Sequence, residues 1–244
     1  MGGEKVTGLR DWRIIAGSRA LLIGGLAVLT ACGSEGSARP DRAAEVPARP
    51  VADTAGRSVP ERPTIVFLGT SLTAGLGLDP DSAYPALIQQ KLDSAGLRYQ
   101  TVNAGVSGES SAGALRRIDW ILRQPPAVIV LETGANDGLR GQDPDSIRAN
   151  LQAMIDRIKG RDPRARIVLA GMEAMPNLGA DYVRRFRAIY PALARANRLP
   201  LIPFLLDSVA GIDSLNQQDG IHPNIAGERI VARNVWKVLE PLLR

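Results

Sequence analysis

Histidine and cysteine are almost missing from this chain of 244 residues, which contains one of each. A single cysteine excludes a disulfide within the chain, and a metal site made of imidazole and thiolate ligands would lack most of its ligands. The remaining acidic pairs, 79/81 and 143/145, have the spacing of turn and helix-cap residues. No Gly-x-Gly-x-x-Gly motif follows a predicted strand, which argues against a dinucleotide-binding site. We therefore expect no metal and no cofactor.

Aromatic residues are also scarce, with three Trp, four Tyr and three Phe. The formal net charge is +5, but the arginines are scattered along the chain rather than gathered in one stripe. A nucleic-acid surface combines clustered basic residues with interleaved aromatic side chains. The sequence therefore predicts that nucleic acid is not a partner.

No apolar run in the sequence reaches the roughly 20 residues that a membrane-spanning helix needs. The most apolar stretch near the start, residues 20–31, has only 12 residues and is preceded by a segment with four basic and two acidic side chains. A basic start, a short apolar stretch and small residues at its end are typical of an export signal. We therefore interpret residues 1–31 as a signal peptide.

Cys32 lies directly after this stretch, and the run Leu29-Thr30-Ala31-Cys32 resembles the lipobox of bacterial lipoproteins. The resemblance implies that Cys32 is lipidated and anchors the protein to a membrane of the bacterial cell envelope, on the periplasmic or the surface side. The alternative is an ordinary cleavable signal with an incidental cysteine. Residues 32–62 are rich in Ala, Arg, Pro, Ser and Glu, which predicts a disordered tether. One folded domain is expected over residues 63–244.

Short apolar runs alternate with helical patterns through this domain. Strands buried on both faces are predicted at 64–68, 128–131 and 167–170, with weaker candidates at 99–102 and 200–204. Helices are predicted at about 84–95, 111–123, 181–197 and 224–241, with another that begins at 143–145 and carries an apolar stripe to residue 158. Five alternations of strand and helix predict an α/β sandwich around a five-stranded parallel sheet.

Four polar, glycine-rich segments come after the predicted strands. They are residues 69–73, 103–109, 132–138 and 219–224. In open α/β sheets, functional groups gather at the carboxyl ends of the strands. We therefore expect these four segments to meet at one edge of the sheet.

The chemistry of these segments is that of a nucleophilic serine. A serine hydroxyl needs a base to take its proton, and a carboxylate must hold that base in the right tautomer. Ser71 follows a buried strand, His222 is the only plausible base, and Asp219 can orient it. A developing oxyanion would find donors in the N–H groups of Ser71 and Gly108 and in the side-chain amide of Asn136.

The order of Ser71, Gly108, Asn136 and His222 resembles the four invariant blocks of the SGNH, or GDSL-type, hydrolases over residues 64–244. The similarity is greatest to the bacterial thioesterase/lysophospholipase and arylesterase branch. It implies a three-layer flavodoxin-like sandwich without a metal. It also implies hydrolysis of aryl, acyl, lysophospholipid-like or thioesters through an acyl-enzyme.

One residue departs from the family pattern, because Thr70 stands where the usual Gly-Asp-Ser-Leu has Asp. In the family, that Asp is not the acid of the triad, so the departure does not affect the predicted triad. The sequence does not determine which hydrogen bonds replace those of the Asp around Ser71. The Gly-x-Ser-x-Gly elbow of the larger α/β-hydrolases is absent from the sequence.

Loops 72–82, 138–143 and 172–180 are expected to shape the acyl pocket. A deacetylase of carbohydrate or peptidoglycan esters and an inactive binding module on the same fold are the alternatives.

The predicted lipid anchor can be tested in the full-length chain. Cys32→Ser removes the thiol that would be acylated, so the protein should move from the membrane to the soluble fraction of a bacterial lysate. Ser34→Ala, two residues away, should leave the distribution unchanged. Continued membrane association of the Cys32→Ser protein would contradict lipidation.

Overall fold

The computed structural model describes residues 62–244. The predicted signal peptide, Cys32 and all but the last residue of the predicted tether lie outside the described residues. Within the described part, the elements run from a strand that starts at Thr64 to a short 3₁₀ helix that ends at Leu242.

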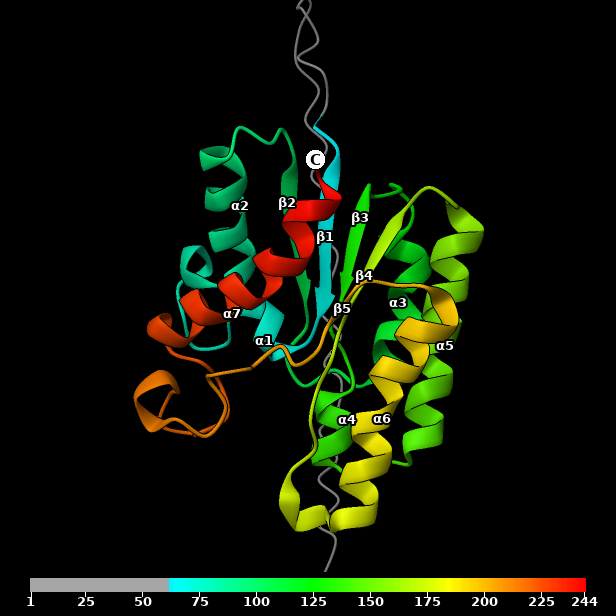
Figure 1. Ribbon diagram of the computed structural model, residues 1–244, viewed down its shortest axis with the longest axis vertical. Helices are drawn as coiled ribbons and strands as arrows, with labels where there is room; N and C mark the ends of the chain where they lie inside the picture. Colours follow the sequence, from blue (N-terminus) through cyan, green and yellow to red (C-terminus); the bar gives the residue numbers. More distant parts are fainter. Residues whose placement is uncertain (1–61) are drawn as a thin grey trace, which may run out of the picture. The chain divides into compact units, whose positions relative to one another are not determined.

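A parallel sheet of five strands forms the centre of the described part (Figure 1). Its strand order is β2-β1-β3-β4-β5, so the chain builds outward from β1 first to one side and then to the other. The predicted α/β class with a five-stranded parallel sheet is confirmed. The strands are β1 (Thr64–Gly69), β2 (Gln100–Gly105), β3 (Val128–Leu131), β4 (Arg166–Ala170) and β5 (Leu201–Ile202).

The two edge strands differ most from the sequence prediction. Strand β2 extends to Gly105 rather than residue 102, and its side chains are half-buried or exposed, which explains its weak apolar signal. Strand β5 has only two residues instead of five. The predicted run began at Pro200 and included Pro203, and proline has no N–H to donate to a sheet ladder.

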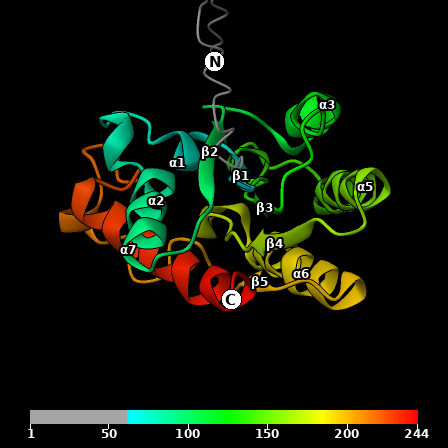
Figure 2. The ribbon, with the colours of Figure 1, turned by 90° about the horizontal axis from the view of Figure 1, so that it is seen from above.

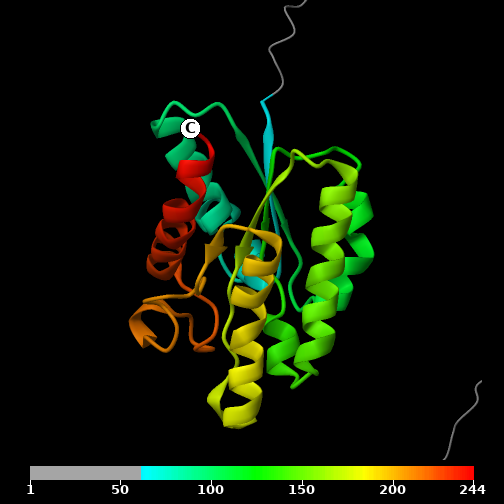
Figure 3. The ribbon, with the colours of Figure 1, turned by 45° about the vertical axis from the view of Figure 1, so that its right-hand side comes forward.

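Among the described residues, six α-helices cover the sheet in two layers, and a seventh, α4, lies at the carboxyl ends of the strands. Figure 2 shows α1, α2 and α7 on one face and α3, α5 and α6 on the other, and Figure 3 shows the same two layers from the side. The helices are α1 (Ser71–Ala74), α2 (Tyr84–Ser94), α3 (Ser111–Ile121), α4 (Ala135–Leu139), α5 (Pro144–Arg161), α6 (Ala180–Asn197) and α7 (Ile225–Leu239). Four 3₁₀ helices span Pro80–Ser82, Pro176–Leu178, Asp213–Leu215 and Glu240–Leu242.

Side-chain caps determine where three of the long helices begin. Ser110 accepts a hydrogen bond from the Gly113 N–H, Asp143 from the Ser146 N–H, and Asn224 from the N–H groups of the first turn of α7. Each oxygen satisfies an N–H that has no partner inside its helix. Helices α1 and α4 were not predicted, because four or five residues are too few to show a helical period.

The core fills both sides of the sheet with aliphatic side chains. Strand β3 is buried at all four positions, and α5 contributes the predicted stripe from Ile147 to Ile158. Phe67 of β1 meets Tyr84 of α2 edge to face, with ring centroids 5.4 Å apart. Within residues 62–244, no helix is both long and apolar enough to span a bilayer.

Two of the buried carboxylates have raised pKa values, and sequence patterns did not predict their burial. Glu228 of α7 is 1 % exposed and accepts a hydrogen bond of 2.7 Å from the Tyr84 N–H. Burial raises the pKa of Glu228 to about 8. Glu132, directly after β3, is fully buried, and burial raises its pKa to about 7.

The raised pKa of Glu228 predicts how stability depends on pH. The folded protein holds this proton up to about pH 8, whereas an unfolded chain releases it near pH 4.3. The free energy of unfolding therefore falls as the pH rises from 5 to 8, by roughly 3–4 kcal/mol for this group. Glu228→Gln should remove that share of the slope in urea denaturation measured between pH 5 and 9.

Glu173→Gln removes a surface carboxylate and serves as the control for a simple change of net charge. If plots of the free energy of unfolding against pH for Glu228→Gln and for the wild type stay parallel over this range, the raised pKa of Glu228 is contradicted.

Candidate active site

Ser71 is the first residue of α1 and lies two residues beyond the end of β1. Figure 1 shows α1 and α4 beside the carboxyl ends of the strands. The β2 strand ends close to this turn, because a Cβ on Gly105 would lie 2.8 Å from the Thr70 carbonyl oxygen. Glycine at position 105 therefore allows the second strand end to approach the serine.

His222 and Asp219 lie on a loop that is fixed by its own hydrogen bonds. Asp219 Oδ1 accepts the N–H groups of Ile221 at 2.9 Å and of His222 at 3.0 Å. Gly220, between them, has the left-handed φ of +68° that this tight turn requires. The Gln217 N–H donates to the His222 carbonyl at 2.8 Å and closes the loop.

The three predicted triad side chains lie in line. His222 Nε2 is 2.9 Å from Ser71 Oγ, and Nδ1 is 2.6 Å from Asp219 Oδ2. Hydrogen bonds from the backbone N–H and then the side chain of His222 lower the pKa of Asp219 to about 2. A carboxylate that is ionised at neutral pH only accepts hydrogen bonds, so Nδ1 carries the proton and Nε2 can accept one from the serine.

Three donors lie on the loops that follow β1, β2 and β3. Within residues 62–244, no hydrogen-bond acceptor pairs with the N–H of Ser71 or of Gly108. Gly108 has a left-handed φ of +76°. Asn136 Nδ2 donates to the Glu109 carbonyl at 3.1 Å, which leaves its second N–H for a ligand. This set of donors is suited to an oxyanion.

Residues that the sequence reasoning missed hold these loops in place. Arg140 donates to the Gly108 carbonyl at 2.9 Å. Asp137 is fully buried and accepts the N–H of Ser111 at 2.8 Å and its hydroxyl at 2.6 Å, so the loop after β3 is tied to α3. The only signal for Asp137 in the sequence was its place next to Asn136.

An ion pair supports the other side of the site. Arg117 Nη2 is 2.7 Å from Glu109, and it also donates to the carbonyls of Ala104 at 2.8 Å and Gly69 at 3.3 Å. One guanidinium thus connects the ends of β1 and β2 to the loop that carries Gly108. Sequence patterns could not pair these residues, because 48 positions separate Arg117 from Gly69.

The hydrogen bonding around Thr70, which the sequence left open, is defined by Glu132. The Thr70 N–H donates to Glu132 Oε2 at 2.7 Å, and the Thr70 hydroxyl lies 3.1 Å from both carboxylate oxygens. Thr73 donates to the same carboxylate at 2.9 Å. The threonine at position 70 therefore supplies two donors to a buried acceptor.

Large apolar side chains are exposed on the loops at this edge of the sheet. Five of them are between 40 % and 47 % exposed: Leu76, Val106, Leu139, Met175 and Ile221. Each of the three loops expected to shape the acyl pocket contributes one of them. We call these five residues the apolar rim.

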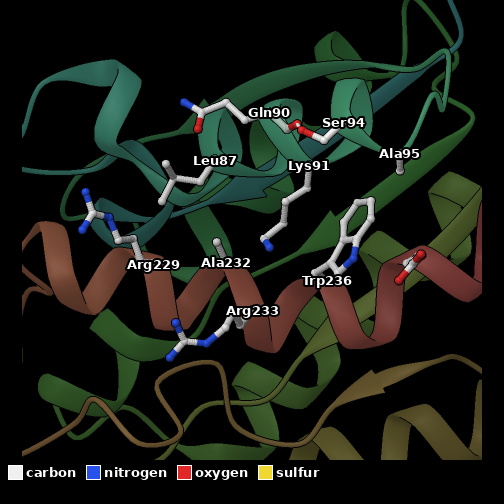
Figure 4. A pocket seen from close by; sticks show the side chains of 10 residues that line it. Leu87, Gln90, Lys91, Ser94, Ala95, Arg229, Ala232, Arg233 and Trp236 are labelled. Atoms are coloured by element: carbon white, nitrogen blue, oxygen red, sulfur yellow. Dashed lines mark hydrogen bonds between the residues drawn. The ribbon is translucent and has the colours of Figure 1, made fainter.

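Two large hollows of the described part lie away from the triad. One, of about 610 Å³, lies between α2 and α7 and is lined by Leu87, Lys91, Arg229, Arg233 and Trp236 among others (Figure 4). The other, of about 620 Å³, is formed largely by α6. Neither is lined by a residue of the predicted triad or oxyanion hole, although Pro176 and Ala180 of the second belong to a loop expected to shape the acyl pocket. The catalytic geometry rather than the size of a cavity therefore identifies the site.

A serine, an imidazole and a carboxylate in line at the carboxyl edge of a parallel sheet define the class of serine hydrolases. Within residues 62–244, no group of three or more potential metal ligands occurs. The chain belongs to the GDSL-like lipase/acylhydrolase family, whose sequence profile matches residues 67–230. The resemblance seen in the sequence is confirmed, and the chain is a carboxylic ester hydrolase.

Characterised relatives are similar over most of the domain. Esterase TesA of Pseudomonas aeruginosa is 40 % identical over 181 residues, which cover 74 % of this chain and 89 % of TesA. Thioesterase 1/protease 1/lysophospholipase L1 of Escherichia coli K12 is 35 % identical over 181 residues, or 74 % of this chain and 85 % of the relative.

The fold also matches that of a solved structure. The crystal structure of the psychrotrophic esterase EstA from Pseudoalteromonas sp., inhibited by monoethylphosphonate, has a TM-score of 0.70 and 31 % identity. The match covers 74 % of this chain and 98 % of EstA.

Removal of the Asn136 amide tests its place among the donors. Asn136→Ala should lower kcat for an aryl ester about 10²- to 10³-fold, because one oxyanion donor is lost. Asn234→Ala, which removes an amide bonded to carbonyls elsewhere, should leave kcat within twofold of wild type. An effect of Asn136→Ala on KM alone would assign the residue to substrate positioning instead.

Proposed function

We propose that this protein hydrolyses carboxylic esters through an acyl-enzyme on Ser71. The observation that carries the proposal is the pair of hydrogen bonds at His222, 2.9 Å to Ser71 Oγ and 2.6 Å to Asp219. They align a proton acceptor with the hydroxyl and a fixed negative charge behind it. The inhibition of the related EstA by a phosphonate also supports a covalent step.

In the first half-reaction, Ser71 Oγ attacks the acyl carbonyl and its proton passes to His222 Nε2. The carbonyl oxygen becomes an oxyanion that the N–H groups of Ser71 and Gly108 and the amide of Asn136 stabilise. Collapse of this intermediate breaks the bond to the leaving oxygen or sulfur, which takes the proton from His222. The negative charge of Asp219 stabilises the imidazolium meanwhile.

In the second half-reaction, water attacks the acyl carbonyl and gives its proton to Nε2 of His222. The new tetrahedral intermediate collapses, the bond between the acyl carbon and Ser71 Oγ breaks, and the serine recovers a proton from His222. The products are the free acid and an unmodified enzyme.

The apolar rim favours substrates with a hydrophobic part. Leu76, Val106, Leu139, Met175 and Ile221 offer exposed apolar surface on segments at the carboxyl edge of the sheet, and burial of each methylene of an acyl chain is worth about 0.8 kcal/mol. We therefore infer short to medium acyl groups on a hydrophobic or aromatic leaving group.

The predicted export signal and the lipobox-like run support an envelope location with a lipid anchor at Cys32.

A panel of p-nitrophenyl esters from acetate to palmitate, with an acetylated sugar alongside, tests the substrate class. We expect kcat/KM to rise severalfold from acetate to the medium-chain esters, because added methylenes contact the apolar rim. Ser71→Ala should reduce turnover of every ester at least 10³-fold. Preference for the acetylated sugar over all aryl esters would support the deacetylase instead, and wild-type rates from Ser71→Ala would overturn the mechanism.

A further inference from the structure

Glu132 is the buried carboxylate beneath the turn that carries Ser71. It follows the last residue of β3, its side chain is fully buried, and it accepts three hydrogen bonds from that turn. Two come from the N–H and the hydroxyl of Thr70, at 2.7 and 3.1 Å, and one comes from the hydroxyl of Thr73 at 2.9 Å. The residue before the serine and the residue two after it thus share one acceptor.

This arrangement is costly, because a buried carboxylate loses the solvation of its charge. Within the described residues, no lysine, arginine or histidine forms an ion pair with Glu132. Burial raises its pKa to about 7, and the threonine hydrogen bonds oppose that shift. The other titratable groups that face it are the hydroxyl of Tyr84, through Thr73, the carboxylate of Glu228 on α7 and the hydroxyl of Tyr190 on α6.

Among the described residues, no side chain caps the first turn of α1. Thr70 is the N-cap of this four-residue helix, but its side chain makes no cap hydrogen bond to the helix. Both donors of Thr70 point to Glu132 instead, so the carboxylate determines the conformation of Thr70. That conformation sets the direction of the next peptide N–H, which belongs to Ser71.

The chain packs tightly around this acceptor. A Cβ on Gly69 would lie 2.5 Å from Glu132 Oε2, so only glycine lets the end of β1 pass beside the carboxylate. On the β2 side, Asn103 donates to the Thr73 carbonyl at 2.8 Å. Glu132 fixes the turn from the β3 side, where no other polar side chain among the described residues bonds to Thr70.

We propose that Glu132 is a positioning residue for ester hydrolysis: by holding Thr70 and Thr73, it keeps Ser71 Oγ in line with His222 and aims the Ser71 N–H at the oxyanion. The inference rests on the proposed role of Ser71 as nucleophile. Glu132 does not touch the reacting atoms, because Thr70 and Thr73 lie between its carboxylate and the serine. Its effect therefore falls on kcat rather than on substrate binding.

Glu228 provides a matched control, because it is another buried carboxylate that accepts a backbone N–H but makes no hydrogen bond to the Ser71 turn. A purely structural role for Glu132 would make the two residues equivalent. Glu132→Ala and Glu228→Ala should both lower the Tm, whereas only Glu132→Ala should lower kcat specifically.

The experiment measures kcat and KM with p-nitrophenyl butyrate, the Tm, and the rate at which a fluorophosphonate labels the serine. For Glu132→Ala we expect kcat to fall 10- to 100-fold, KM to stay within threefold, and labelling to slow in parallel with kcat. Glu132→Gln keeps an acceptor oxygen for the Thr70 N–H and should restore kcat to within about threefold of wild type. Glu228→Ala should keep kcat within twofold.

Thr70→Val tests the same contact without removing the buried carboxylate, in case Glu132→Ala does not fold. Loss of one donor should lower kcat threefold to tenfold with KM unchanged, and this loss should disappear when Glu132 is already Ala. Wild-type kcat in Glu132→Ala or in Thr70→Val would overturn the proposal, as would an equal loss of kcat in Glu228→Ala.

Ser71→Ala separates this proposal from the one on which it rests. If Ser71→Ala still reacts with the fluorophosphonate at the wild-type rate, then Ser71 is not the nucleophile and the proposed function fails. If Ser71→Ala is unreactive while Glu132→Ala reacts normally, only the positioning role fails.

Discussion

The common level at which three parallel strands end is the constraint on which the rest of the site depends. β1 pairs with β2 up to Gly69 and Gly105, and with β3 up to Leu68 and Leu131. The chain therefore leaves the sheet three times at nearly the same height. Because Ser71, Gly108 and Asn136 follow these strand ends within five residues, short loops suffice to bring a nucleophile and its oxyanion donors together. A shift of one strand by a single residue would turn its side chains to the opposite face.

The base is positioned in a different way, because His222 does not follow a strand. Its loop is fixed by the Asp219 carboxylate, which accepts two N–H groups of its own turn, and by the contact between Gln217 and the His222 carbonyl. The Asn224 cap then starts α7, which packs against α2 and holds the loop to the domain. The candidate triad thus joins a proposed nucleophile placed by the sheet to a proposed base placed by local hydrogen bonds.

Two carboxylates near this edge of the sheet have different pKa values and different roles, because their surroundings differ. Asp219 is partly exposed and surrounded by N–H donors, which lower its pKa to about 2 and keep it charged beside the imidazole. Glu132 is buried without a cation, and its pKa rises to about 7. In the proposed mechanism, the first carboxylate stabilises the positive charge that His222 develops. The second, Glu132, makes no hydrogen bond to Ser71 or His222 and instead accepts hydrogen bonds from Thr70 and Thr73 in the turn that carries Ser71.

The sequence by itself determined the α/β class, the three central strands, the long helices and the residues of the candidate triad, since each depends on a local pattern. Apolar runs mark buried strands, capping residues mark helix starts, and an Asp three residues before the sole His marks a base with its partner. Only the tertiary structure decided the roles of Glu132, Arg117, Asp137 and Glu228, as well as the length of the edge strands. Their contacts join positions 8 to 144 residues apart, and burial, which sets their energetic cost, arises only when distant segments pack together.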